Sequence, residues 1–133
     1  HTRSDMVRSV YEGISYALRS VLDVFQDNQV GIRDMILIGG GAKSRLWNEM
    51  LCSIFALPVK VHSFPDVATS LGAAIAAGVG VGMFHDFRTA AEAVYSRRCT
   101  PVESECREYE KHYRIYRSVY PRLKPVYDRI AEL

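Results

Sequence analysis

The sequence predicts an α/β fold in which parallel strands are flanked by helices and followed by a helical C-terminal tail. Residues 35–77 run in the order strand, glycine loop, helix, strand and helix, which is typical of parallel strands joined by right-handed crossovers. Two longer segments, 5–25 and 102–120, carry apolar residues at helical spacing. With 133 residues, the chain is one modest domain or part of a larger one.

The first expected element is a helix over residues 5–25. Thr2 supplies a polar side chain for the helix start, and Gly31 follows its end. Spacings of three and four residues are the mark of one apolar helical face. Its members are Val7, Val10, Tyr11, Ile14, Leu18, Val21 and Phe25, and the opposite face carries Arg8, Glu12, Arg19 and Asp23.

The central part of the chain contains two expected strands. Residues 35–38 form an apolar run without polar alternation, which is typical of a strand covered on both faces. A glycine loop and a helix over residues 43–56 follow. Residues 59–62 alternate in polarity, so we expect a second strand that is half exposed or near an edge. A helix of small residues is expected over 69–77.

From Arg88 onward the sequence predicts only helices. A short helix is expected over residues 90–95 and a long one over 102–120, and Pro121 and Pro125 limit the remainder to a short final helix. Two strands alone leave unpaired backbone groups at both sheet edges. We therefore expect the sheet to be completed by a longer polypeptide or by a second copy, and the isolated chain to self-associate or to be marginally stable.

Composition excludes several classes of function. The net charge of +2 is too mild to indicate a nucleic-acid or membrane-surface partner. Three cysteines without CxxC spacing argue against a disulfide framework and a zinc site, and favour a reducing compartment such as the cytoplasm. The uncharged stretch 68–84 is dominated by Ala and Gly and is too short for a membrane span.

The glycine loop over residues 39–41 is the strongest local signal of function. Glycines between a buried strand and a helix leave backbone N–H groups free and allow a ligand to approach the main chain, which favours a binding loop over a plain turn. A phosphate-binding P-loop is excluded because Leu37 and Ala42 occupy its glycine positions. A dinucleotide fingerprint fails because Ser44 stands where a third Gly or Ala is required.

The other polar and aromatic residues favour structural roles. The sequence indicates neither a catalytic residue nor a metal site. The histidines have no nearby carboxylate or serine for a proton relay, and the two carboxylates near turns are expected to cap those turns. A tyrosine stripe at helical spacing favours core packing over nucleic-acid stacking. The residues in question are His62, His85 and His112; Asp66 and Asp86; and Tyr109, Tyr113, Tyr116 and Tyr120.

Several motifs in this order resemble the C-terminal part of the FGGY family of carbohydrate kinases, with the xylulose kinases as the most similar members. They are Ile38-Gly39-Gly40-Gly41-Ala42-Lys43-Ser44 with Trp47, then Leu57-Pro58-Val59, then Leu71-Gly72-Ala73-Ala74. The opening residues 1–13 and the tail 109–125 resemble the same family, so the likeness covers essentially the whole chain.

The resemblance implies a ribonuclease H-like domain of the actin and hexokinase type, with ATP and sugar bound between two domains. Residues 1–97 would be the later, nucleotide-side part of the second domain, and residues 98–133 would be C-terminal helices packing on it. Three residues of the glycine loop would line the nucleoside of ATP, with two more in the first helical turn nearby. These are Gly40, Gly41 and Ala42, followed by Ser44 and Arg45, where Arg45 replaces the Asn of some relatives such as the glycerol kinases.

The resemblance also implies a function for the longer protein. It would transfer the γ-phosphate of ATP to a ketose hydroxyl, with D-xylulose as the expected acceptor. The catalytic Asp, the phosphate-binding motifs and most contacts to Mg²⁺ would lie upstream, in the N-terminal part of the same polypeptide, so we expect this chain alone to be inactive. The alternatives are an FGGY kinase for ribulose, gluconate or glycerol, and a non-catalytic nucleotide-binding module.

Overall fold

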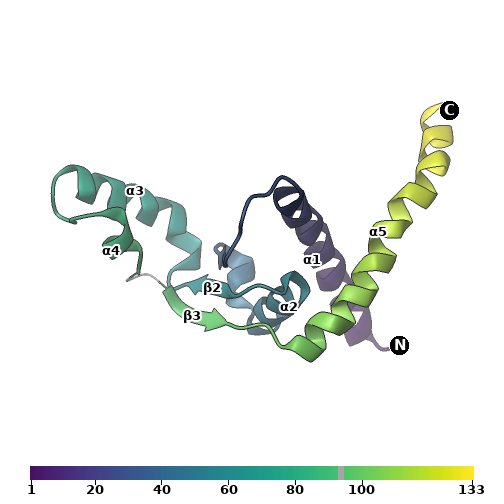
Figure 1. Ribbon diagram of the computed structural model, residues 1–133, viewed down its shortest axis with the longest axis horizontal. Coiled ribbons are helices and arrows are strands. Elements are labelled where there is room, and N and C mark those ends of the chain that lie inside the picture. Colours follow the sequence, from purple (N-terminus) through teal and green to yellow (C-terminus); the bar gives the residue numbers. More distant parts are fainter. Residues whose placement is uncertain (93–94) are drawn as a thin grey trace. The chain divides into compact units, whose positions relative to one another are not determined.

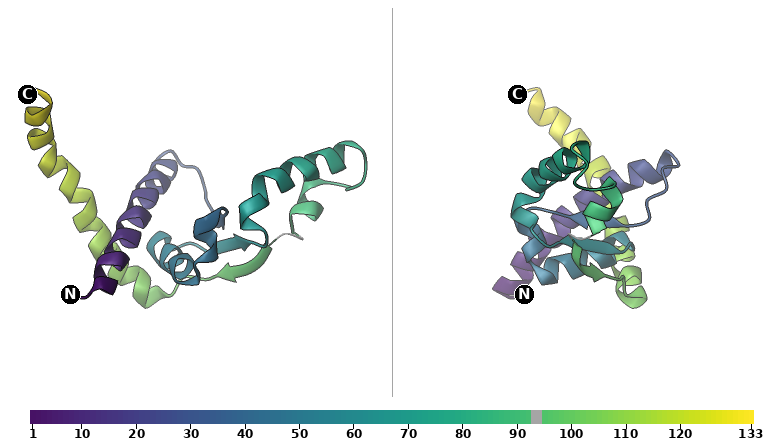
Figure 2. Two further views of the ribbon diagram at one scale, coloured as in Figure 1. Left: turned by 180° about the vertical axis from the view of Figure 1, so that it is seen from behind. Right: turned by 90° about the vertical axis from the view of Figure 1, so that its left-hand side faces the viewer.

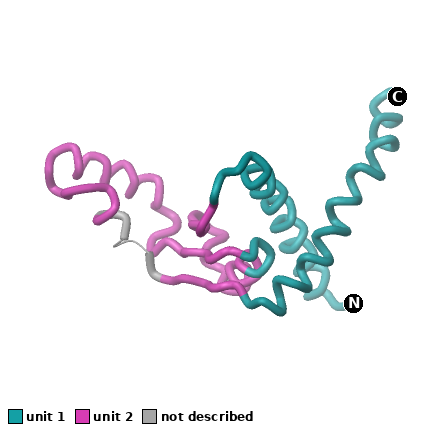
Figure 3. Tube along the Cα trace, in the orientation of Figure 1, with its two compact units in different colours: residues 1–31, 53–56, 102–133 teal, residues 32–52, 57–101 magenta. Residues whose placement is uncertain are grey.

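The computed structural model describes residues 1–92 and 95–133 of the chain, and the side chains of all of these except 90–92 and 95–96. The described residues form two compact units (Figure 3). Unit 1 comprises residues 1–31, 53–56 and 102–133, and unit 2 comprises residues 32–52 and 57–101.

Unit 2 contains a mixed sheet of three strands in the order β1-β2-β3, of which β2 and β3 are labelled in Figure 1. The strands are β1 (Met35–Leu37), β2 (Val59–His62) and β3 (Tyr95–Cys99). Strand β1 pairs with β2 in parallel, with Met35 opposite Val59, whereas β3 is antiparallel to β2, with Cys99 opposite Val59. The predicted parallel pair is therefore confirmed, and a third strand extends the sheet.

Helices and two short 3₁₀ turns complete unit 2. The 3₁₀ turn η1 (Gly40–Lys43) follows β1 and leads into helix α2 (Arg45–Phe55), of which residues 45–52 belong to unit 2. The turn η2 (Pro65–Val67) follows β2 and leads into α3 (Ala68–Gly80), and α4 (Phe87–Glu92) comes after it. The helices predicted over residues 43–56 and 69–77 are confirmed by α2 and α3.

Two long helices make up most of unit 1, α1 (Arg3–Asp27) and α5 (Glu103–Ala131), which lie side by side for part of their length (Figure 2). Thr2 caps α1 in a capping box with Asp5. The guanidinium of Arg8 donates to the hydroxyl of Tyr109 over 2.7 Å. The hydroxyl of Tyr113 donates to Asp23 over 2.5 Å. These bonds join the polar face of α1 to the tyrosine stripe of α5.

The apolar face predicted for α1 is present but exposed. Val10, for example, keeps 60% of its surface accessible, whereas the buried residues of the helix are Ser15, Tyr16 and Leu22. Within the chain alone, this face is therefore not part of the core. The reason is that α5 packs against the opposite, polar and aromatic side of α1, where its tyrosines find hydrogen-bond partners.

Strand β2 is the buried centre of the sheet, with Val59 fully buried, so the prediction of a half-exposed or edge strand is wrong. The cause is β3, which pairs with the other side of β2 and which the sequence did not indicate. Residues 90–95 were expected to be helical, but α4 ends at Glu92 and β3 begins at Tyr95. Residues 93–94 lie outside the described part of the chain. Strand β1, expected to be covered on both faces, exposes Ile36 because it lies at a sheet edge.

Helix α5 continues through Pro121 and Pro125, so the predicted break after residue 120 is wrong. The two prolines are four residues apart, on one side of the helix, and both are exposed. Water can therefore reach the carbonyl groups that proline leaves without an N–H donor. Tyr109 and Tyr113 are buried, as predicted for the tyrosine stripe, but Tyr120 is largely exposed.

Candidate functional site

The glycine loop lies at the carboxyl ends of the two parallel strands. Gly39, directly after β1, has φ = +77°, a backbone conformation that favours glycine. Its N–H donates to the carbonyl of Pro65, in the segment after β2, over 2.8 Å. An ion pair of 2.6 Å between Lys43 and Asp66 joins the same two segments. The carboxyl ends of parallel strands are where α/β proteins bind their ligands.

The turn η1 is closed by its own backbone. The N–H of Ala42 donates to the carbonyl of Gly39, and the N–H of Ser44 donates to the carbonyl of Gly41, both over 3.1 Å. The hydroxyl of Ser44 then accepts the N–H of Trp47 over 3.3 Å, as the cap of helix α2. The sequence therefore folds three of the five predicted site residues, Gly40, Gly41 and Ala42, into one tight turn, with Ser44 at its end.

Gly40 and Gly41 differ in what surrounds them. A Cβ on Gly41 would stand 2.3 Å from the indole ring of Trp47, so packing inside the protein requires glycine there. A Cβ on Gly40 would meet no protein atom within 4 Å, and Gly40 is exposed. Among the described residues, nothing in the packing requires Gly40 to be bare, and its main chain is open to a ligand.

Ala42 is only 4% exposed and therefore contributes to the buried side of the turn. Its carbonyl oxygen accepts a hydrogen bond of 2.8 Å from the side-chain amide of Asn48, which is fully buried. Sequence reasoning missed Asn48. The available signal was its position, because Asn48 lies four residues after Ser44 and four before Cys52, on the buried side of the amphipathic helix α2.

Arg45 is the first residue of α2, and its side chain is exposed. It pairs with Glu49 over 2.8 Å, one helical turn further on. The hydrogen bond to Glu49 is the main cause that raises the pKa of Arg45 above its usual value, and the negative charge of the same carboxylate contributes less. The guanidinium is therefore a permanent cation beside the turn, in a surface ion pair that a ligand can displace at little cost.

The other polar candidates have structural partners. Asp86 accepts the N–H of Thr89 over 2.7 Å, and this bond lowers the pKa of the carboxyl group. His62 is buried, and its Nδ1 accepts the N–H of Phe64 over 3.0 Å. In the ranges 1–92 and 95–133, no three His, Cys, Asp or Glu side chains come together as a metal site would require. The expectation that the histidines have no carboxylate partner is wrong for His85, whose Nδ1 lies 3.3 Å from Oδ2 of Asp86, with both side chains exposed.

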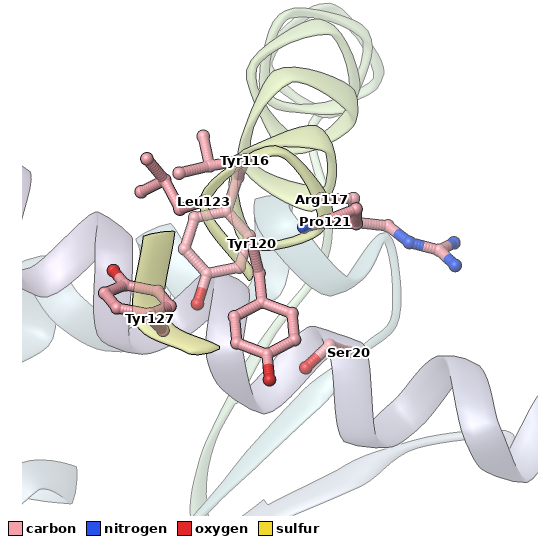
Figure 4. A pocket seen from close by; sticks show the side chains of 8 residues that line it. Ser20, Tyr116, Arg117, Tyr120, Pro121, Leu123 and Tyr127 are labelled. Atoms are coloured by element: carbon pink, nitrogen blue, oxygen red, sulfur yellow. The ribbon is translucent and has the colours of Figure 1, made fainter. Parts of the chain in front are cut away.

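A hollow lies in unit 1 between α1 and α5 (Figure 4). It is lined mainly by aromatic and aliphatic side chains, among them Tyr116, Tyr120 and Leu123, with Ser20 as the only member from α1. The rings of Tyr120 and Tyr127 stack there with centroids 6.3 Å apart. Since the lining holds neither a carboxylate nor a histidine, the hollow lacks the groups that acid–base chemistry requires.

Within the part of the chain that the structure describes, every helix is too short or too polar to span a bilayer.

Residues 1–81 match the family described as "FGGY family of carbohydrate kinases, C-terminal domain". The xylulose kinase of Staphylococcus xylosus is 30% identical over 121 residues, which cover 90% of this chain and 25% of that protein. The autoinducer-2 kinase of Enterobacter sp. (strain 638) is 36% identical over 93 residues, which cover 68% of this chain and 17% of that protein.

Among solved structures, that of xylulose kinase from Rhodospirillum rubrum superimposes with a TM-score of 0.84 at 25% sequence identity. The superposition covers 96% of this chain and 26% of that one. The chain therefore spans about a quarter of the length of the xylulose kinases that it matches. The expected fold class is confirmed by this likeness: the described part is α/β, mostly helical, with a small mixed sheet.

Proposed function

This chain belongs to the FGGY family of carbohydrate kinases, and on that premise we propose that it is the nucleotide-side part of a sugar kinase. The whole enzyme transfers the γ-phosphate of ATP to a hydroxyl group of a ketose. D-xylulose, giving xylulose 5-phosphate, is the proposed acceptor. Support for this substrate comes from the xylulose kinases at 30% identity or more over most of the chain.

The single observation that carries the nucleotide role is the bare, exposed main chain at Gly40. An adenine ring needs a flat surface that it can approach closely, and the main chain of a glycine without Cβ provides one. The nucleoside of ATP lies on Gly40 and Gly41 in this proposal, and the neighbouring Ala42 shapes the turn from beneath. Ser44 and Arg45 border the nucleotide from the first turn of α2, where the cation of Arg45 favours an anionic ligand.

The groups that phosphoryl transfer requires are assigned to different parts of the enzyme. Phosphoryl transfer requires a base for the sugar hydroxyl, groups that position the phosphates, and Mg²⁺. We assign these to the part of the polypeptide outside this chain, and assign residues 1–97 to the second kinase domain and 98–133 to helices that pack on it. Closure of the two domains then covers the nucleotide and excludes water from the reaction.

The exposed apolar face of α1 supports a longer polypeptide. Seven apolar residues of this face stay at least 39% exposed in the chain alone. A face of this size on a water-soluble helix marks a contact with another part of a protein. We propose the N-terminal part of the same polypeptide as that partner. The face consists of Val7, Val10, Tyr11, Ile14, Leu18, Val21 and Phe25.

The proposed cellular site is the cytoplasm. Among the described residues, Cys52, Cys99 and Cys106 form no disulfide bond, which is typical of proteins in a reducing compartment.

A second acceptor class has its own support, because an autoinducer-2 kinase matches this chain at 36% identity over a shorter stretch. The sugar contacts are assigned outside this chain, so its residues do not discriminate between acceptors. The test is to measure ADP formation by the full-length enzyme with D-xylulose, L-ribulose, gluconate, glycerol and autoinducer-2 at equal concentrations. D-xylulose is expected to give the highest kcat/KM, and a clear preference for another acceptor would contradict the proposed substrate.

A further inference from the structure

The most deeply buried polar side chain of α2 acts on the glycine turn. Asn48 is 0% exposed, and its Nδ2 group donates to the carbonyl oxygen of Ala42 over 2.8 Å. The backbone N–H of Asn48 donates to the carbonyl of Ser44 over 3.0 Å, so the residue is fixed to the helix that begins at the turn. Asn48 therefore joins the turn to α2 across six residues of the chain.

The orientation of this amide is forced by its surroundings. A carbonyl oxygen accepts hydrogen bonds, so only the NH₂ side of Asn48 can face Ala42. The Oδ1 atom is then directed to a buried place where, among the described residues, it has no hydrogen-bond partner. An unsatisfied buried oxygen destabilises the fold. An apolar residue at position 48 would carry no unsatisfied oxygen of its own. The presence of an amide is therefore explained by the hydrogen bond that its NH₂ group donates to the carbonyl of Ala42.

We propose that Asn48 is the positioning residue of the nucleotide-binding turn: it fixes the carbonyl of Ala42 and thereby holds the main chain of Gly40 and Gly41 in the geometry that receives the nucleoside. This inference rests on the proposed function, because it concerns the same site. Two further contacts restrain the turn from other directions, the bond from Gly39 to Pro65 and the packing of Trp47 on Gly41. Asn48 restrains the end of the turn that enters α2.

The test uses the full-length enzyme with Asn48→Leu, which has the same number of non-hydrogen side-chain atoms, the same branching at Cγ and a better helix propensity. This variant removes both the donor to Ala42 and the unsatisfied oxygen. The variant leaves the Ala42 carbonyl, in place of Oδ1, as the unsatisfied buried oxygen, and leucine is bulkier, so the thermal unfolding midpoint is expected to be unchanged or slightly lower. The Kd for a non-hydrolysable ATP analogue is expected to rise about five- to tenfold, which corresponds to the loss of one hydrogen bond. The KM for the sugar is expected to stay the same.

Cys52→Ala provides the matched control, because Cys52 is equally buried on α2, one turn further on, and its thiol faces the carbonyl of Leu57 instead of the turn. This control is expected to lower the unfolding midpoint without changing the Kd. A folded Asn48→Leu enzyme with unchanged affinity for the analogue would overturn the inference.

Asn48→Asp gives a second readout that a purely structural role would not produce. An ionised carboxylate has no hydrogen to donate to Ala42, whereas the protonated acid has one. The Kd of this variant, relative to the wild type at the same pH, is expected to be high at alkaline pH and to fall as the pH is lowered. A ratio that is independent of pH would overturn the positioning role.

Gly40→Val in the same enzyme separates this inference from the proposed function. If Gly40→Val weakens analogue binding and Asn48→Leu does not, only the role of Asn48 is wrong. If neither variant changes the Kd, the nucleotide binds elsewhere and both proposals are wrong.

Discussion

The indole ring of Trp47 lies against Gly41 so closely that a Cβ on the glycine would stand 2.3 Å from the ring. The same helix therefore fixes the glycine turn twice, through the ring of Trp47 and through the amide of Asn48. The neighbouring Gly40 has open space where a Cβ would be. One glycine is thus required by the protein itself, and the other leaves room for a ligand.

Gly41→Ala is predicted to destabilise the protein by about 1–3 kcal/mol, because the added methyl group displaces the ring of Trp47 from a packed position. Gly40→Ala is the matched control, with an expected change within about 0.5 kcal/mol for an exposed position. Urea denaturation of the two variants measures the difference. Equal effects of the two substitutions would contradict the close contact between Gly41 and Trp47.

Two tyrosines in the contact between α1 and α5 are predicted to respond differently to removal of the hydroxyl group. Tyr113→Phe loses the hydrogen bond to Asp23 and leaves a carboxylate with one partner fewer, which is expected to cost about 1–2 kcal/mol. Tyr16→Phe removes a buried hydroxyl without a hydrogen-bond partner among the described residues, so stability is expected to be unchanged or higher. Urea denaturation compares the two, and a larger loss for Tyr16→Phe would contradict this assignment.

The same helix pair predicts sensitivity to alkaline pH. Burial is the main cause that raises the pKa of Tyr16, to about 12, and it also raises the pKa of Tyr109 and of Tyr113. In the unfolded chain the pKa of these tyrosines is about 10. A group with a raised folded pKa stabilises the fold fully below its unfolded pKa, and this contribution is lost as the pH rises through the folded value.

Stability is therefore expected to fall between about pH 10 and about pH 12. The absorbance of tyrosinate, followed during an alkaline titration, is expected to show a late group of tyrosines that ionise together with unfolding. The Tyr16→Phe variant should lose part of this late amplitude. Ionisation of all tyrosines near the ordinary pKa, without unfolding, would contradict the burial of these rings.

The isolated chain is predicted to self-associate, because the apolar face of α1 and the end of α5 both expose large side chains. Val10 and Leu18 represent the first surface, and Tyr120 and Ile130 the second. Analytical ultracentrifugation is expected to show a mass that rises with protein concentration. Replacing Val10 and Leu18 by serine should reduce the association, whereas a concentration-independent monomer of the unaltered chain would contradict the proposal that this face needs a partner.

Local sequence patterns were sufficient for the elements whose residues interact with near neighbours. The polar side chain of Thr2, the apolar periodicity before Asp27 and the glycines after β1 predicted helix α1 and the loop correctly. The predicted site residues also fold together, because they are consecutive or nearly so. Their contact with a nucleotide stays a prediction.

The errors occurred where distant segments decide the structure. Strand β3 contains Arg97 and Arg98 and has no apolar pattern of its own, so its pairing with β2 depends on backbone partners far away in the sequence. The burial of Val61 in the central strand has the same origin. Asn48 was missed because a polar residue on an amphipathic helix is usually solvated, and only the position of the Ala42 carbonyl shows its purpose.

The most direct test is a crystal structure of the full-length enzyme with a bound non-hydrolysable ATP analogue. The adenosine is expected in van der Waals contact with the main chain of Gly40 and Gly41, and no atom of the turn should separate them. A nucleoside bound away from this turn, with the space above Gly40 filled by another part of the polypeptide, would contradict the nucleotide-binding role.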